Sequence, residues 1–139
     1  MPVITDFGVS LDDGPLAPLG EAADGGSLRV LVPADADGAM VAAQADRFDL
    51  IGVQFDRFSD GRGFSLARRL RDLGFRGRLR AVGHLIPDQF AYARACGFDE
   101  VQVDDATFAR QGEEAWIRAA GAATPPFRAR AQASRRRGL

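Results

Sequence analysis

The stretch DLIGVQFDRFSDGRGFSLARRLR, residues 49–71, decides the fold class of this chain. Its first part, residues 50–55, is an apolar run typical of a buried β-strand. Its last part places Leu66, Ala67 and Leu70 on one face of an amphipathic helix. Between them lies a loop, residues 56–63, with two aspartates, two arginines and two glycines. A charged loop that contains glycine and joins a strand to a helix is a typical ligand site of open α/β folds.

The same strand–loop–helix unit occurs four times in the chain. Strands that alternate with helices form parallel sheets through right-handed crossovers. We therefore expect an α/β fold with a parallel sheet of about four βα units, as a flavodoxin-like open sheet. The alternative is half of a β/α barrel. The predicted strands are 28–32, 50–55, 78–82 and 100–103, and the predicted helices are 36–46, 64–73, 87–96 and 105–120. Gly97 predicts a left-handed end to the third helix, with Phe98 folded back onto it.

Three segments are predicted along the chain of 139 residues. Residues 1–27 form an N-terminal extension, in which VITDFGVSL favours a short strand or hairpin before a loop rich in turn-forming residues. Residues 28–121 form the α/β core domain, and this length favours one domain with its own core. Residues 122–139 form a flexible, arginine-rich tail.

Composition and charge exclude several classes of protein. The net charge of −1 gives no overall attraction to nucleic acid or to a membrane. Cys96 is the single cysteine, so an intramolecular disulfide or an iron–sulfur cluster does not form, and we predict that it packs in the core. With one cysteine and one histidine, a zinc site is not expected either. We expect no metal and no cofactor. The chain shows neither a signal-peptide pattern nor an apolar run of about 20 residues, so we expect a cytoplasmic protein.

The loops that follow the four predicted strands are expected to meet at one edge of the sheet. In a parallel sheet every such loop lies at the carboxyl edge, which is the usual ligand site of open α/β sheets and of β/α barrels. We call this edge the carboxyl rim. Its charged residues are expected to be Asp35, Asp56, Arg57, Asp60, Arg62, His84, Asp104 and Asp105.

The charged loop on this rim has two interpretations. Arg57 and Arg62 could bind an oxyanion in two-point fashion, while Gly61 and Gly63 let backbone N–H groups approach it. Alternatively, Asp56 and Asp60 clamp the two arginines in a lattice of salt bridges that holds the loop. His84 and Asp60 are the candidates for a general acid or base, and the alternative for His84 is a loop imidazole that caps a backbone group.

Three segments of the chain resemble a bacterial family of unknown biochemical function. They are DRFSDGRGFSLARRLR, GFRGRLRAVGHLIPDQF and ARACGFDE, which together span roughly residues 49–103. Members of that family are described as oxidoreductases or accessory proteins of sulfite reduction, and are typically encoded beside the sulfite reductase haemoprotein. The resemblance implies an anion- or partner-binding role for Asp56, Arg57, Asp60, Gly61, Arg62, Gly63, Ser65, His84, Asp88 and Gln89. Phe58 also matches the family, and no catalytic residue is agreed for it.

Two functions from different classes follow. The first is an accessory protein of assimilatory sulfite reduction, which binds the sulfite reductase haemoprotein or its electron donor and has no redox cofactor of its own. The second is a small enzyme or binding protein for a sulfur oxyanion or a phosphorylated metabolite at the carboxyl rim. A homodimer is compatible with both. Whether the chain is an enzyme is left open by the sequence.

Overall fold

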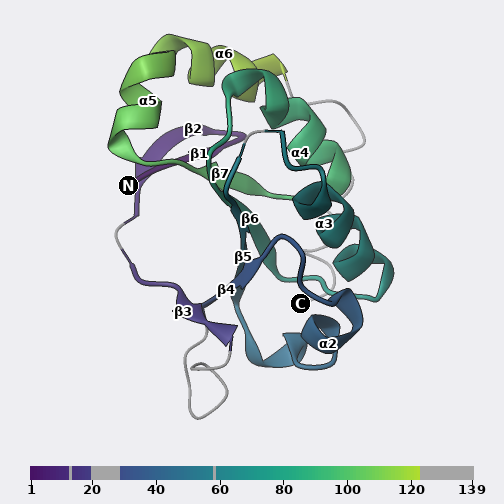
Figure 1. Cartoon of the computed structure of the whole chain (residues 1–139). Coiled ribbons are helices and arrows are strands. Elements are labelled where there is room, and N and C mark those ends of the chain that lie inside the picture. Colours follow the sequence, from purple (N-terminus) through teal and green to yellow (C-terminus); the bar gives the residue numbers. More distant parts are fainter. Residues whose placement is uncertain (13, 20–28, 58, 123–139) are drawn as a thin grey trace.

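The computed structural model describes residues 1–12, 14–19, 29–57 and 59–122. These residues form an open sheet in the order β2-β1-β7-β6-β5-β4-β3, with helices along one side of it (Figure 1). The predicted open α/β sheet with four βα units is therefore confirmed. The predicted tail, 122–139, lies outside the described residues except for Ala122, and Phe58 also lies outside them.

Four of the strands are those predicted, and they run parallel to one another. Their bounds are β4 (Arg29–Pro33), β5 (Leu50–Phe55), β6 (Arg78–Gly83) and β7 (Glu100–Gln102). Residues before position 28 add strands at both ends of this set. They are β1 (Pro2–Thr5), β2 (Gly8–Leu11) and β3 (Ala17–Pro18). The β1–β2 hairpin matches the hairpin expected in this region, and it joins the sheet antiparallel to β7, whereas β3 pairs parallel to β4.

The helices follow the predicted order with differences in extent, and the helix predicted at 87–96 starts as the 3-10 turn Pro87–Gln89. Their bounds are α2 (Gly38–Ala42), α3 (Arg62–Asp72), α4 (Phe90–Cys96), α5 (Asp105–Gln111) and α6 (Glu113–Ala122), with the 3-10 turns η1 (Ala45–Arg47) and η2 (Pro87–Gln89). The helix predicted at 36–46 is shorter, because it ends at Ala42 and is followed by η1. The single helix predicted at 105–120 is wrong. Gly112, with φ of 88°, ends α5 and starts a new helix.

The end of α4 is as predicted. Gly97 has a left-handed φ of 115°, and the N–H of Phe98 donates to the carbonyl of Ala93 at 3.0 Å. This bond satisfies a carbonyl that the helix end would otherwise leave without a donor. Among the described helices, none is both long enough and apolar enough to cross a membrane.

The helices among the described residues that pack on the sheet lie on the same face of it. Helix α2 packs against α3, α3 against α4, and α4 against α6. Alternate residues of the strands face this layer and form the main core, including Val53, Phe55, Leu79 and Val101. Phe55 is at the centre, with the ring of Phe64 at 4.9 Å and that of Phe98 at 5.8 Å. Cys96 is buried in this core, as predicted.

The winding of the sheet is sequential. Strands β4 to β7 lie side by side in chain order, whereas a flavodoxin-like sheet has the order 2-1-3-4-5 and helices on both faces. A half-barrel shares the sequential order, although here β1 and β2 extend the sheet and leave it open. Because the order does not reverse among β4 to β7, this part of the sheet has no crevice between helices of opposite faces.

The second face of the sheet carries polar residues in register. Arg80 pairs across the sheet with Gly52 and Glu100, and Val82 pairs with Gln54 and Gln102. Cross-strand partners share a face, so these side chains point away from the helices. Arg80 is only 1% exposed and donates to Glu100 at 2.7 Å and to Gln102 at 2.6 Å.

A segment between β2 and β3 crosses this second face, and we call its described residues, 12 and 14–16, the strap (Figure 1). Asp12 fixes the strap, because its carboxylate accepts from Arg29 at 2.7 Å, from Arg80 at 3.0 Å and from the N–H of Gly14 at 2.8 Å. These three hydrogen bonds hold the pKa of Asp12 well below its usual range, with the bond from Arg29 as the largest cause.

Candidate functional site

The carboxyl rim brings together the loops that follow β4, β5, β6 and β7, as expected for parallel strands. Asp35, Asp56, Arg57, His84 and Asp104 are all exposed there. The N-terminal ends of α2 and α3 also reach this edge, because each helix follows the loop after a strand. The rim therefore gathers side chains from four separate segments of the chain.

The charged loop is held by its own residues. Asp60 Oδ1 accepts from the backbone N and from Nε of Arg62, both at 3.1 Å, and Oδ2 accepts from Nη2 at 3.1 Å. The bonds from Arg62 lower the pKa of Asp60, and Asp60 in turn raises the pKa of Arg62. Arg62 Nη1 also lies 3.9 Å from Asp35. The contacts of Arg62 therefore agree with the salt-bridge interpretation of this loop.

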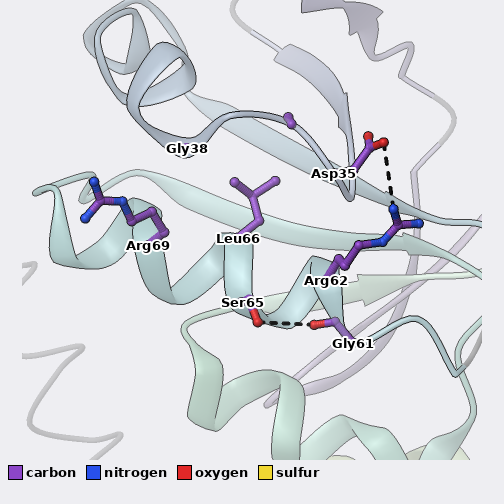
Figure 2. Close-up of a pocket in the computed structure, with 8 residues that line it drawn as sticks. Asp35, Gly38, Gly61, Arg62, Ser65, Leu66 and Arg69 are labelled. Atoms are coloured by element: carbon purple, nitrogen blue, oxygen red, sulfur yellow. Dashed lines mark hydrogen bonds and ion pairs between the residues drawn. The ribbon is translucent and has the colours of Figure 1, made fainter.

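A groove of about 660 Å³ runs between the start of α2 and the start of α3 (Figure 2). Its lining residues are Asp35, Ala36, Gly38, Gly61, Arg62, Ser65, Leu66 and Arg69. The hydroxyl of Ser65 donates to the carbonyl of Gly61 at 3.5 Å. Arg69 has no ion-pair partner among the described residues, and the stem of its side chain lies against the backbone at Gly38. The groove therefore has the Arg69 guanidinium, unpaired among the described residues, at one end, and the Arg62 guanidinium, which Asp60 already holds, at the other (Figure 2).

The two glycines of the loop have different roles. Gly61 has open space where a side chain would be, so it stays available at the surface. Gly63 is buried, and a Cβ atom there would lie 2.3 Å from the ring of Phe55. The absence of a side chain at Gly63 therefore lets α3 pack closely against Phe55 in the core. The role suggested by the sequence was different, namely that Gly63 lets an anion approach the backbone.

His84 lies on the rim beside the loop that precedes α5. Its backbone N–H donates to the carbonyl of Phe55 at 3.0 Å, and its side chain is exposed. Asp104 caps α5 by accepting from the N–H of Thr107 at 2.6 Å. Hydrogen bonds from Thr107 lower the pKa of Asp104, and the charge of His84 adds to this effect. The structure gives His84 neither a hydrogen bond nor an ion pair to Asp56 or Asp60 within the described residues.

The remaining predicted site residues lie on the turn that precedes α4. Gln89 accepts from the N–H of Ile86 at 3.0 Å and so caps the η2 turn. Asp88 is exposed and lines a different groove of about 350 Å³, which lies between α4 and α6. Asp88 and Gln89 are therefore not part of the α2–α3 groove. No cluster of three or more histidine, cysteine or acidic residues that could hold a metal ion occurs in the described part of the chain.

Two features of the site region were not predicted from the sequence. Arg69 was not among the predicted site residues, although its spacing of seven from Arg62 places both on one flank of α3. The polar second face was also missed. Its signal is the alternation of Arg78 and Arg80 with apolar residues in β6, and of Glu100 and Gln102 with valines in β7.

Comparison with known proteins identifies one relationship. The model of a family described as a bacterial protein of unknown function, DUF934, matches residues 29–130. The chain belongs to this family. The match spans β4 to α6 and so includes every loop of the carboxyl rim. Searches of the curated proteins and of the solved structures find no match.

Proposed function

We propose that this protein is an accessory protein of assimilatory sulfite reduction, which binds the sulfite reductase haemoprotein or its electron donor through the carboxyl rim. The link to sulfite reduction is supported by the resemblance of residues 49–103, and the family itself has no established function. The mode of action is supported by the geometry of the rim.

The observation that carries the proposal is that the rim is open and acidic, and that Asp60 already holds its Arg62. Five aspartates of the rim outnumber its two arginines, Arg57 and Arg62. The aspartates are Asp35, Asp56, Asp60, Asp104 and Asp105. The side chains of Arg62 and Asp35 are 67% and 63% exposed. A free oxyanion would have to compete with Asp60 for Arg62 in a negative field. A basic protein surface would instead be attracted to such an edge.

Binding to the two expected partners tests this proposal. The protein is immobilised, and the purified haemoprotein and electron donor from the same host are passed over it separately. At least one should bind, with an affinity that falls as salt rises. The double variant Asp35→Lys/Asp56→Lys reverses two rim charges and should weaken binding by about tenfold or more.

A matched control reverses the same number of charges at the opposite edge of the sheet. Asp46→Lys/Asp49→Lys lies just before β5, where both aspartates are exposed, and should bind like the parent protein. Absence of binding to both partners would refute the accessory function. Equal weakening by both double variants would refute the rim as the docking surface.

The α2–α3 groove favours a second candidate function. Arg69 is unpaired there within the described residues, and Ser65 offers a hydroxyl, so a small enzyme or binding protein for a sulfur oxyanion or a phosphorylated metabolite is the alternative. Calorimetric titration with sulfite, sulfate and phosphate tests it. Saturable binding that is lost in Arg69→Gln would favour this candidate over the first.

A further inference from the structure

A cavity of about 370 Å³ lies under the strap, on the second face of the sheet and away from the α2–α3 groove. Its lining is mainly apolar, with a few polar groups, and consists of Met1, Asp12, Gly14, Pro15, Leu16, Leu31, Gln54, Val82 and Gln102. This volume and this mixture are typical of sites for small molecules.

The cavity lies at the carboxyl half of the sheet. Gln54, Val82 and Gln102 form one row across β5, β6 and β7, close to the carboxyl ends of these strands. In sheets wound sequentially, as in β/α barrels, ligands bind at the carboxyl ends of the strands, among the side chains that face away from the helices. The position of the cavity fits that arrangement.

Two carboxamides face this cavity with hydrogen-bonding capacity to spare. Gln102 is 6% exposed, and its Oε1 accepts from Arg80 at 2.6 Å, which fixes the orientation of the amide. Among the described residues, its Nε2 then donates only to the sulfur of Met1, at 3.5 Å, which is a weak acceptor. The side chain of Gln54 makes no hydrogen bond to any residue that the structure describes. Two strand spacings separate the two glutamines, or about 10 Å between their backbones.

Asp12, the ionised side chain that lines the cavity, is already paired. Asp12 accepts from Arg29, from Arg80 and from the N–H of Gly14, so its carboxylate has no need of a cation from a ligand. Arg80 in turn donates to Asp12, Glu100 and Gln102. The polar side chains left to recognise a ligand are therefore the neutral carboxamides of Gln54 and Gln102.

We propose that this cavity is a binding site for a small, uncharged, planar molecule that carries amide or lactam groups. Its polar edges pair with the carboxamides of Gln54 and Gln102, and its flat faces contact apolar residues such as Leu16, Leu31 and Val82. The ligand displaces the Met1 thioether from Gln102. This site is independent of the carboxyl-rim docking surface proposed above.

The sequence makes a direct test possible, because the chain has six glutamines and no asparagine. A nitrogen–proton correlation spectrum of the full chain therefore shows six side-chain carboxamide pairs. Uracil and nicotinamide serve as neutral probes, and nicotinate serves as the charged analogue of nicotinamide. The neutral probes should shift the carboxamide signals of Gln54 and Gln102 in a saturable way at millimolar concentration. Those of Gln44 and Gln111, which lie on other elements, should not move.

Cavity-filling variants complete the test. Val82→Phe fills the cavity from the sheet, and Leu16→Phe fills it from the strap. Each single variant should weaken probe binding by about tenfold or more. Ser65→Leu alters the α2–α3 groove and should leave binding unchanged. The proposal is overturned if neither neutral probe gives a saturable shift at Gln54 and Gln102. It is also overturned if nicotinate binds as well as nicotinamide, or if binding persists in a well-folded Val82→Phe or Leu16→Phe protein.

Discussion

Replacement of Arg80 by methionine tests how much the buried polar network stabilises the fold. Methionine keeps much of the apolar stem of the arginine and removes the guanidinium. The change removes three hydrogen bonds, to Glu100, Gln102 and Asp12. Loss of one partner from a buried ion pair typically costs about 3–5 kcal/mol, because the other charge is left buried without compensation.

The structure places this variant at the low end of that range. Glu100 keeps the guanidinium of Arg78 at 3.0 Å, and Asp12 keeps Arg29 at 2.7 Å, so neither carboxylate loses every cation. We expect Arg80→Met to lower the free energy of unfolding by about 3 kcal/mol. With an m-value of about 1.5 kcal/mol/M, the midpoint of urea unfolding falls by about 2 M.

Fluorescence of Trp116 provides the assay, because it is the single tryptophan of the chain and is fully buried. The matched control is Arg76→Met, since Arg76 is exposed and has no ion-pair partner among the described residues. The control should stay within about 0.5 kcal/mol of the parent protein. If Arg80→Met is equal to the parent or more stable, the network contributes no net stability and the reasoning is refuted.

Three further predictions concern the loop and the strap. Gly63→Ala should destabilise the protein by about 1–3 kcal/mol, because the added Cβ meets the Phe55 ring. Gly61→Ala has open space for its Cβ and should change the free energy of unfolding by less than about 0.5 kcal/mol. Equal effects of the two variants in urea unfolding would contradict the roles assigned to these glycines. Because the folded state lowers the pKa of Asp12, its contribution to stability is present above the ordinary carboxyl pKa of 3.8 and is lost as the pH falls. Asp12→Asn should therefore be less stable than the parent at pH 7, and the difference between their urea midpoints should narrow below about pH 4. The pKa of Asp60, followed by carbon NMR, should rise in Arg62→Met, because the hydrogen bonds from Arg62 are the main cause of the lowered pKa. An unchanged pKa would show that the Asp60–Arg62 pair does not persist in solution.

The fold was predictable where the signal lies within neighbouring residues. The apolar run of β5 and the stop at Gly97 are local patterns, and both appear as expected. The break at Gly112 was not predicted, because a glycine within a helical pattern is often tolerated. Strand β3 has two residues and pairs with a segment of the chain beyond it, so its sequence alone contains too little pattern to identify it.

The candidate site was predictable in its position and less so in its contacts. The predicted parallel topology alone places Asp35, Asp60, Arg62 and His84 on one rim. The choice of Asp60 as the partner of Arg62 depends on the turn that brings the two together, with the N–H of Asp60 bonded to the carbonyl of Arg57. The role of Gly63 depends on Phe55, which belongs to another element, so spacing within the loop did not reveal it.

The position of β1 has a consequence for the order in which the chain folds. Val3 pairs with Gln102, and the N–H of Val103 donates to the carbonyl of Pro2 at 3.1 Å. During synthesis, β1 therefore lacks its second neighbour until β7, the last described strand, has left the ribosome. Contacts between residues so distant in sequence form slowly, because a long loop must close first. We expect β4 to β6 and their helices to assemble early, and the N-terminal hairpin to dock late, as the edge that completes the sheet.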